Sequence, residues 1–228
     1  MKLSVIMPAY NEKNTILEIL EKIKKIKLDK EIIIVDDFSS DGTREILNAL
    51  DKNNIKIIFH EKNYGKGNAI RTALKYASGD IIIIQDADLE YNPEDYYSLI
   101  KPILAKESKV VYGTRFPKEK RKISRFKNKY FLGNMILTVV ANILYNAKIT
   151  DEATCYKVFD AELLKSINLK CRRFEFCPEV TAKLRKLNER IIEVPVRYFP
   201  RGENEGKKIR YKDGFEALWT LLKYRFVN

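Results

Sequence analysis

Two aspartates separated by one residue follow an unbroken apolar run and are the residues of this chain best placed to do chemistry. Asp86 and Asp88 come shortly after the isoleucines at 81–84. Two carboxylates at this spacing, where a strand opens into a loop, can both reach one hard cation, and Mg²⁺ or Mn²⁺ takes oxygen ligands together with diphosphate oxygens. Glu90 is placed to supply a third ligand. The alternative interpretation is that these acids cap a helix that begins near Pro93.

A second acidic pair, Asp36 and Asp37, follows another apolar run and leads into the polar segment at 38–43. A carboxylate at this place can accept hydrogen bonds from a nucleobase or a ribose. A turn and a helix cap formed by Ser40 or Asp41 account for part of the same pattern. We take Asp37 as the candidate ligand contact of this pair.

Other reactive residue types carry weaker signals. The loop NYGKG at 63–67 has neither the spacing of a P-loop nor that of a dinucleotide fold, which disfavours an ATPase or an NAD enzyme. His60 is the single histidine, and we interpret it as structural. Cys155, Cys171 and Cys177 lack CxxC spacing. They predict a reduced protein with neither a disulfide framework nor a zinc knuckle.

The elements that position these residues alternate regularly in the first half of the chain. Short β-branched runs predict strands at 3–7, 31–35, 55–59, 80–84 and 109–112, and amphipathic stretches predict helices at 16–26, 41–50, 68–77 and 93–105. Such alternation indicates a parallel sheet covered on both faces. Ligands bind such sheets beyond the carboxyl ends of the strands. The polar loops at 8–12, 36–42, 61–67, 85–91 and 113–116 are expected to gather at that edge.

The second half is less regular. It opens with a basic stretch at 115–130 that has eight positive charges and one negative. An apolar helix at 131–146 is interrupted by polar residues, so we do not expect it to span a membrane. The remaining expected elements are strands at 156–159 and 190–196 and helices at 160–167, 178–187 and 213–226. No internal repeat and no linker is evident, and one continuous domain over 1–228 is expected.

The composition bounds the class of protein. With 45% hydrophobic, 11% aromatic and 32% charged residues in 228, a disordered or collagen-like chain is excluded. The first apolar run ends at Pro8 and is too short for a secretory signal, which predicts a cytoplasmic protein. Lys and Arg number 43 against 31 Asp and Glu, a net charge of +12. Residues 1–113 are close to neutral and residues 114–228 carry the excess, so the second half is expected to face nucleic acid, an acidic membrane or a phosphorylated substrate.

Several motifs in a fixed order give a more specific indication. They are PAYNE, VDDFSSDGT, NYGKGNA, DADLEYNPED, YGTRF, TDEATCYKVF, FEFCPEVTAKL and PRGENEGKKIRYKDG. This series resembles the family 2 glycosyltransferases with the GT-A fold, and within them the branch of dolichol-phosphate mannosyltransferases and polyprenyl-phosphate sugar transferases. The resemblance implies an α/β fold with a mostly parallel central sheet flanked by helices. It also implies a nucleotide-binding half at 1–113 and an acceptor-binding half at 114–228, which ends in an amphipathic helix.

The resemblance also implies roles for individual residues. The nucleoside pocket would be lined by Pro8, Tyr10, Glu12, Val35 and Asp37. Asp86 and Ala87 would contact the nucleotide, and Asp88 with Glu90 would hold the divalent metal, Mg²⁺ or Mn²⁺. The donor diphosphate and an acceptor phosphate would be held by Arg115, Arg125, Arg201 and Lys207 or Lys208. This chain has Glu90 where the dolichol-phosphate enzymes often have Gln, and its last motif is longer than the usual RxxGxSK.

The expected reaction is an inverting, metal-dependent transfer. A hexose would move from a nucleotide diphosphate sugar of the GDP-mannose or UDP-glucose type to a polyprenyl or dolichyl phosphate at the cytoplasmic face of a membrane. The alternative acceptor is a hydroxyl of a cell-surface glycan, which needs a general base, and Asp151 or Glu152 is the candidate. A phosphate acceptor is already an anion and needs none. The alternative for Asp151 and Glu152 is that they lie in a solvated loop or form an ion pair with the basic segment.

Two further classes are weaker. A nucleic-acid-binding module is motivated by the basic half, but no RNP, KH or helix-turn-helix pattern appears. A sugar nucleotidylyltransferase would have a glycine-rich basic loop after the first strand, and PAYNEKN is not one. We therefore expect no nucleic-acid partner.

Two segments predict peripheral association with an anionic membrane surface. One is the basic segment at 115–129 with Phe116, Phe126 and the adjacent Tyr130, and the other is the closing helix with Trp219. A solvated face for the first segment and core packing for Trp219 are the alternatives. A membrane-protein partner or a homo-oligomer is also compatible with these segments.

Overall fold

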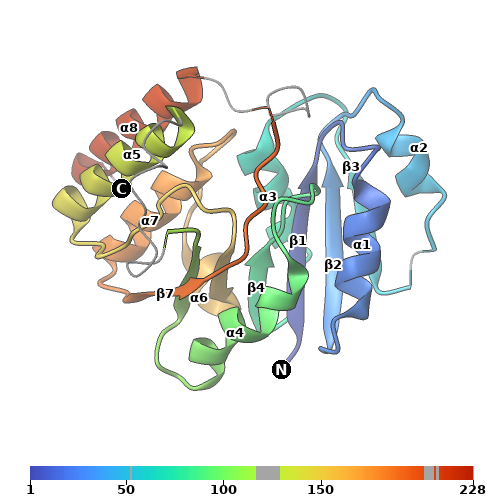
Figure 1. Ribbon diagram of the computed structural model, residues 1–228, viewed down its shortest axis with the longest axis horizontal. Helices are drawn as coiled ribbons and strands as arrows, with labels where there is room; N and C mark the ends of the chain where they lie inside the picture. Colours follow the sequence, from blue (N-terminus) through green and yellow to red (C-terminus); the bar gives the residue numbers. More distant parts are fainter. Residues whose placement is uncertain (52, 117–128, 203–207, 209–210, 228) are drawn as a thin grey trace.

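The computed structural model describes residues 1–51, 53–116, 129–202, 208 and 211–227, and within them a sheet of seven strands forms the centre of the protein (Figure 1). Its spatial order is β3-β2-β1-β4-β6-β5-β7. The strands are β1 (Leu3–Ala9), β2 (Lys30–Asp36), β3 (Ile55–Phe59), β4 (Ile81–Ile84), β5 (Val110–Thr114), β6 (Lys157–Asp160) and β7 (Ile191–Pro195).

Most of the sheet is parallel, as predicted. β1 pairs in parallel with β2 and β4, β2 with β3, and β5 with β7. β6 is inserted between β4 and β5 and runs antiparallel to both. The alternation of strands and helices did not reveal this insertion. Val158 and Phe159 are buried, and a strand covered on both faces has the same apolar pattern in either direction.

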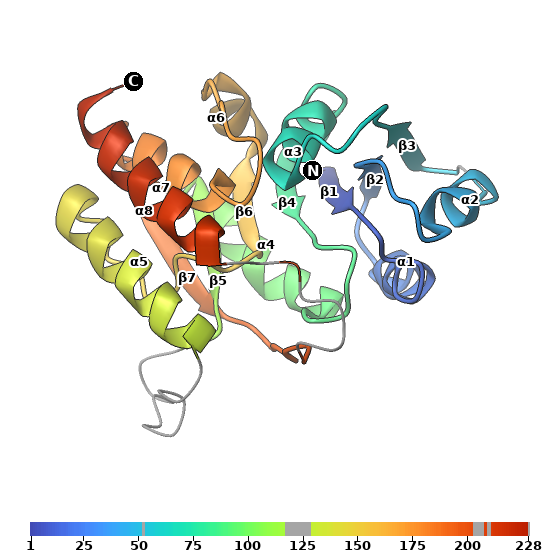
Figure 2. The same cartoon turned by 90° about the horizontal axis from the view of Figure 1, so that it is seen from above.

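Helices cover both faces of the sheet. Figure 2 shows α3, α6 and α7 on one face and α1 and α4 on the other. The helices are α1 (Ile16–Lys25), α2 (Thr43–Asn48), α3 (Lys66–Leu74), α4 (Tyr96–Leu104) after a 3-10 turn η1 (Pro93–Asp95), α5 (Lys129–Tyr145), α6 (Ala161–Ser166), α7 (Phe176–Lys186) and α8 (Tyr211–Phe226). α5 and α8 pack side by side at the β7 end, and α8 also packs on α7. Every helix expected from the sequence is present.

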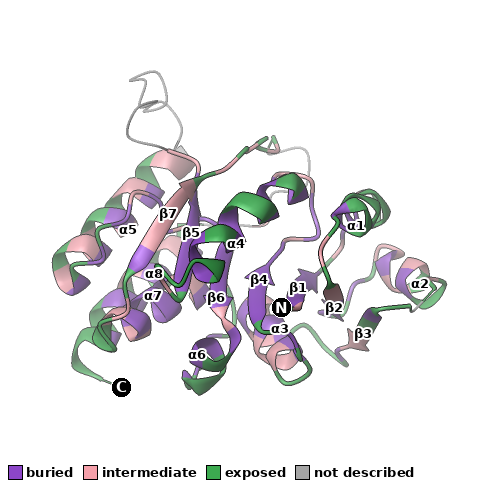
Figure 3. Cartoon of the chain, turned by 90° about the horizontal axis from the view of Figure 1, so that it is seen from below, coloured by how far each residue is buried: buried purple, intermediate pink, exposed green. Residues whose placement is uncertain are grey.

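The core lies along the central strands. β1 and β4 are buried over their whole length (Figure 3). Their side chains are held from both faces, which fixes the backbone where each strand ends and the polar loops begin. Among the helices that the structure describes, none combines the length and apolar character needed to cross a bilayer.

Candidate functional site

Four carboxylates from the first half gather around cations at the carboxyl edge of β1 and β4. Glu12 follows β1, and Asp86, Asp88 and Glu90 follow β4. Because β1 and β4 are parallel neighbours, their carboxyl ends meet at one edge of the sheet. The sequence predicted that the loops at 8–12 and 85–91 meet at this edge. In the structure Glu12, Asp88 and Glu90 share contacts with Arg201, and Asp86 pairs with Lys66.

Arg201 is the centre of this cluster. Its Nη2 lies 2.7 Å from Oδ2 of Asp88, and its Nη1 lies 3.1 Å from Oε2 of Glu12. Its backbone N–H donates to Oε1 of Glu90 at 2.9 Å. The Nζ of Lys208 donates to Oε1 of Glu12 at 2.6 Å and also to the carbonyl of Tyr10. Two predicted phosphate ligands, Arg201 and Lys208, are therefore held beside the predicted metal and donor residues.

Asp86 has a separate cation, Lys66. The Lys66 Nζ lies 2.5 Å from Oδ1 of Asp86. Burial alone would lower the pKa of Lys66, but the Asp86 carboxylate raises it well above its ordinary value, so Lys66 stays charged. Lys66 was not among the predicted site residues. Its signal was the NYGKG motif, which carried too little specificity without knowledge of where that loop folds.

The surroundings of Asp88 disfavour its ionised form. Burial, followed by the Asp86 carboxylate, raises the pKa of Asp88 to about 7, and Arg201 opposes this rise. A buried acid beside other acids is stabilised by a positive partner. In this structure the guanidinium of Arg201 supplies that charge.

The side chains around Asp88 fit a divalent cation of the Mg²⁺ or Mn²⁺ type, because these ions prefer oxygen ligands and Asp86 and Glu90 offer carboxylate oxygens beside it. Within the described residues, no three His, Cys, Asp or Glu side chains form a complete metal site. An ion held by Asp88 would therefore need further oxygen ligands from a bound molecule. This is the usual arrangement for Mg²⁺, which is bound by one or two carboxylates together with substrate phosphates.

Asp37 anchors the loop at 61–67. Its carboxylate accepts hydrogen bonds from the backbone N–H groups of Tyr64 at 2.9 Å and Gly65 at 2.7 Å. Nδ1 of His60 lies 2.7 Å from the same carboxylate, and the other ring nitrogen of His60 lies 3.0 Å from the Thr72 hydroxyl. His60 is thus a buried link between this loop and α3, as the sequence predicted. The role of Asp37 as a ligand contact stays a prediction.

The other predicted donor residues lie along the same edge. Pro8 and Val35 are register partners across β1 and β2, and both are buried. The carbonyl of Ala87 accepts a hydrogen bond from Thr15, and Tyr10 is exposed. Pro8 and Val35 lie in the strands that lead to this edge, and Tyr10 and Ala87 lie in the loops that follow β1 and β4. The contact of these residues with a nucleotide stays a prediction.

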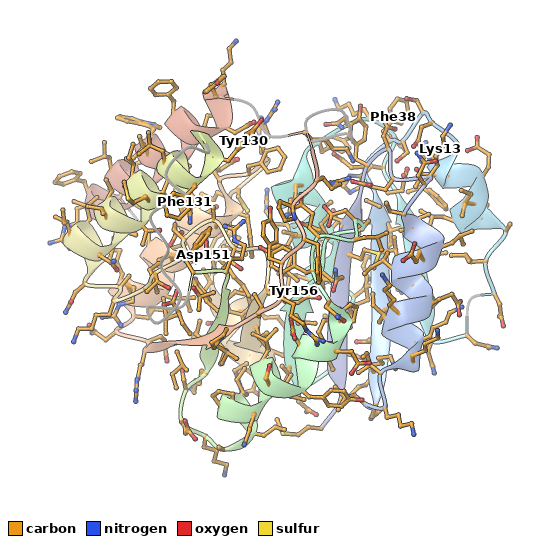
Figure 4. The ribbon with its side chains drawn as sticks, in the orientation of Figure 1. Lys13, Phe38, Tyr130, Phe131, Asp151 and Tyr156 are labelled. Atoms are coloured by element: carbon orange, nitrogen blue, oxygen red, sulfur yellow. The ribbon has the colours of Figure 1, made fainter. Side chains whose placement is uncertain are left out.

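Gln85 is a second residue that the sequence did not reveal as important. It is fully buried between β4 and the DAD motif, and its Oε1 accepts hydrogen bonds from the hydroxyls of Tyr96 at 2.6 Å and Tyr156 at 2.8 Å. These two contacts tie the end of β4 to α4 and to the segment before β6. They fix the position of the backbone from which Asp86 and Asp88 project. Tyr156 is labelled in Figure 4.

Arg115 and Asp151 form a buried ion pair. The Arg115 Nε and Nη2 lie 2.7 and 2.6 Å from the two Asp151 oxygens, and the Arg115 backbone N–H also donates to Asp151 at 3.0 Å. Asn134 of α5 donates to the same carboxylate at 2.9 Å, and Asp151 is labelled in Figure 4. The Arg115 guanidinium also lies over the ring of Tyr198, whose hydroxyl donates to Glu90. A base role for Asp151 would require this pair to open.

Glu152 is buried beside that pair. Its carboxyl group is fully buried, and the Thr181 hydroxyl is the polar side-chain group that favours its ionised form. Burial raises the pKa of Glu152 to about 8, against the opposing influence of Lys157. Glu152 is therefore an interior acid whose protonated form is favoured by burial. The remaining predicted phosphate ligands, Arg125 and Lys207, lie outside the described residues.

Comparison with known proteins agrees with this arrangement. A model of the family described as "Glycosyl transferase family 2" matches residues 4–167. The chain is 32% identical to the UDP-N-acetylglucosamine--dolichyl-phosphate N-acetylglucosaminyltransferase of Methanococcus voltae, over 96% of this chain and 94% of that protein. It is 30% identical to the dolichol-phosphate mannosyltransferase of Pyrococcus furiosus, over 98% of this chain and 64% of that protein.

A solved structure has the same fold. The chain superposes on glucosyl-3-phosphoglycerate synthase from Mycobacterium tuberculosis with a TM-score of 0.77 and 18% identity, over 100% of this chain and 79% of that one. That protein was crystallised with Mn²⁺, uridine diphosphate and phosphoglyceric acid. The superposition confirms the predicted GT-A fold.

Proposed function

The chain belongs to glycosyl transferase family 2 and is a glycosyltransferase, and we propose that it moves a hexose unit from a nucleotide diphosphate sugar to a polyprenyl or dolichyl phosphate. The observation that carries this proposal is the contact of Arg201 with Asp88 and Glu12. This contact joins acidic residues of the first half of the chain to a basic residue of the second half, at the edge of the sheet where ligands bind. The relatives that share nearly the whole of this chain support the lipid phosphate acceptor through their names.

The donor would bind over the carboxylate cluster. Asp88 would bind Mg²⁺ or Mn²⁺ together with phosphate oxygens of the donor, with Asp86 and Glu90 beside it, and the ion would supply positive charge to the diphosphate as it leaves. Arg201 and Lys208 would bind phosphate oxygens of the donor or of the acceptor, because both cations already lie at this edge. Lys66 keeps Asp86 ionised and in place.

The surroundings of Asp151 favour a phosphate acceptor over a hydroxyl. A hydroxyl acceptor needs a general base, and Asp151 is locked in a bidentate pair with Arg115. Glu152 is fully buried, so it could reach an acceptor hydroxyl only if the surrounding chain opened. A phosphate acceptor attacks as an anion and needs no general base. Asp151 can then stay paired with Arg115, and Glu152 can stay buried.

We propose further that the chain works at an anionic membrane surface, at the cytoplasmic face. The acceptor would be embedded there through its prenyl chain. The positive excess of residues 114–228 is then matched by a diphosphate donor, a lipid phosphate and the membrane, so that no nucleic-acid partner is needed to explain it.

The experiment is a thermal-shift panel of UDP-N-acetylglucosamine, UDP-glucose and GDP-mannose, each with and without Mn²⁺. We expect one donor class to raise the melting temperature only when the metal is present, because both ligands bind the folded state alone. Asp88→Asn should lose this increase. If no donor shifts the melting temperature of the wild-type protein in the presence of Mn²⁺, the proposed donor site is wrong.

A further inference from the structure

Helix α5 is apolar on its exposed side as well as on its packed side, which is unusual for a surface helix. Its polar side chains face the protein: Asn134 donates to Asp151, and Asn142 bonds both the carbonyl and the N–H of Ile149. The Thr138 hydroxyl likewise accepts from the N–H of Glu152. A surface helix of a water-soluble domain normally turns its apolar side inward and its polar side to solvent.

The outward side of α5 is apolar. Leu132, Ile136, Val139 and Ile143 are all exposed, and Ile143 is 76% exposed. They recur at steps of four, three and four residues, which places them in one stripe along the helix. Residues 130–145 contain no charged side chain at all. Nothing in this stripe favours contact with water.

α8 repeats the pattern with aromatic residues. Phe215, Trp219, Leu222 and Phe226 recur at the same steps and are exposed, Trp219 by 65% and Phe226 by 86%. The opposite side of α8 is buried against α7 and α5, where the Tyr145 hydroxyl donates to the carbonyl of Leu221 at 2.5 Å. The two stripes therefore lie on neighbouring helices, on the flank of the protein remote from α1 and α2 (Figures 1 and 2).

The charges around the stripes favour an anionic lipid surface over a second copy of the chain as the binding partner. The exposed charged residues of α8 are Lys212, Glu216, Lys223 and Arg225, a net charge of +2. A second copy of the chain docked on the same face would bring like charges together, whereas anionic lipid headgroups would pair with them. Aromatic and aliphatic side chains flanked by Lys and Arg are also the composition of helices that lie in a membrane interface.

We propose that the exposed faces of α5 and α8 form one lipid-binding surface that inserts both stripes into an anionic bilayer. The inference deepens the proposed function and rests on it for its purpose, because a lipid-linked acceptor has to be met at a membrane. α8 begins ten residues after Arg201, which pairs with Asp88. The surface would hold the carboxylate cluster close to the bilayer from which the acceptor phosphate projects.

Trp219 tests the proposal directly, because it is the single tryptophan of the chain. Its fluorescence emission is measured as vesicles of phosphatidylcholine, with or without phosphatidylglycerol, are added to the full-length protein. We expect a blue shift with the anionic vesicles, and quenching when the lipids carry bromine on their acyl chains. An emission that does not respond to anionic vesicles would overturn the proposal. A blue shift that follows protein concentration without lipid, together with a dimer in sedimentation, would also overturn it, in favour of a second copy.

Matched variants distinguish lipid binding by this surface from nonspecific adsorption of the protein to vesicles. Ile136→Ser with Ile143→Ser, and Phe215→Ser with Phe226→Ser, should each weaken vesicle partitioning by about tenfold or more, because large apolar side chains no longer leave water. Leu17→Ser with Leu104→Ser removes two side chains that are each 48% exposed on α1 and α4, and should leave partitioning unchanged. All these side chains are at the surface, so melting temperatures should stay close to that of the wild type. Equal loss in the control variant would contradict the assignment.

Transfer to a short, water-soluble prenyl phosphate distinguishes failure of this inference from failure of the proposed function. Vesicle binding without transfer to any prenyl phosphate would support the surface and reject the function. Transfer to the soluble acceptor without vesicle binding would support the function and reject the surface. If both are correct, the stripe variants keep activity on the soluble acceptor and lose it on an acceptor embedded in vesicles.

Discussion

Asp151→Asn tests whether Asp151 is a structural acid or a catalytic base. In the wild type, its carboxylate accepts hydrogen bonds from the backbone N–H, Nε and Nη2 of Arg115, and from Asn134. The Arg115 side chain is only 12% exposed, and that of Asp151 is 0% exposed. Asparagine keeps one oxygen but removes the negative charge, so the buried guanidinium of Arg115 loses the charge of the carboxylate that it pairs with.

The magnitude follows from burial. Removing one partner of a buried ion pair costs about 3 to 5 kcal/mol of the free energy of unfolding, and the amide oxygen that remains places this change at the lower end, about 3 kcal/mol. A chain of 228 residues loses roughly 2 to 4 °C of melting temperature per kcal/mol. We therefore expect Asp151→Asn to melt about 6 to 12 °C below the wild type.

The chain contains a matched control pair, Arg197 and Asp95. Asp95 accepts from the backbone N–H and Nε of Arg197, each at 2.8 Å, and from its Nη2 at 2.7 Å, which is the same set of donors. The Arg197 side chain, however, is 51% exposed. Asp95→Asn should therefore cost only about 1 kcal/mol or less, because water can solvate the released guanidinium.

The assay is thermal unfolding of the three proteins by circular dichroism, with transferase turnover measured on the same samples well below each melting temperature. A large loss of stability in Asp151→Asn, with turnover kept per folded molecule, supports the structural role. An unchanged melting temperature together with a loss of turnover would exclude the structural role. That result would make Asp151 a base and would favour a hydroxyl acceptor.

Three further predictions concern single side chains. Burial raises the pKa of Glu152 from 4.5 to about 8, so its contribution to stability is full below pH 4.5 and is lost as the pH rises toward 8. Urea unfolding at several pH values should show a fall of up to about 1.4 kcal/mol per pH unit in the wild type and a flatter profile in Glu152→Gln; parallel profiles would contradict this. The pKa of Asp88 is raised to about 7, so protons compete with Mn²⁺ below that pH. The Mn²⁺ affinity, followed by calorimetry in the presence of the donor, should fall about tenfold per pH unit below 7, and a pH-independent affinity would exclude Asp88 as the ligand. Gly65 has φ of +93°, and a Cβ there would lie 2.4 Å from the Arg172 carbonyl oxygen, whereas a Cβ on Gly133 in α5 meets no atom within 4 Å. Gly65→Ala should cost about 2 kcal/mol or more in urea unfolding and Gly133→Ala should add about 0.5 to 1 kcal/mol; the reverse order would show that the loop at 61–67 is not held as described.

The parts of the fold that could be predicted are those with a local signal. The runs at 32–35 and 81–84 are apolar at every position, which identifies parallel strands buried on both faces. Parallel strands place their carboxyl ends together, so the gathering of Glu12, Asp86, Asp88 and Glu90 followed from the order of elements. The recurring motifs supplied the family.

Contacts between distant segments could not be predicted in the same way. The Lys66–Asp86 pair depends on how the loop at 61–67 folds, and Asp37 anchors that loop through backbone N–H groups that any residues would provide. The antiparallel insertion of β6 is set by pairing with both neighbours, not by its own residues. In α5, Asn134 and Asn142 read as interruptions of an apolar helix, and only the fold reveals that they face inward.

The fate of the donor sugar decides whether this chain transfers a hexose to a lipid phosphate. A nucleotide sugar with a labelled hexose is incubated with the protein, Mn²⁺ and a polyprenyl phosphate in anionic vesicles, and the label is counted after extraction into an organic phase. We predict metal-dependent transfer of label to the lipid phosphate, a loss of about 10²- to 10³-fold in Asp88→Asn, and retention of transfer in Glu152→Gln. Label that stays in the aqueous phase, or an Asp88→Asn variant as active as the wild type, would contradict the account.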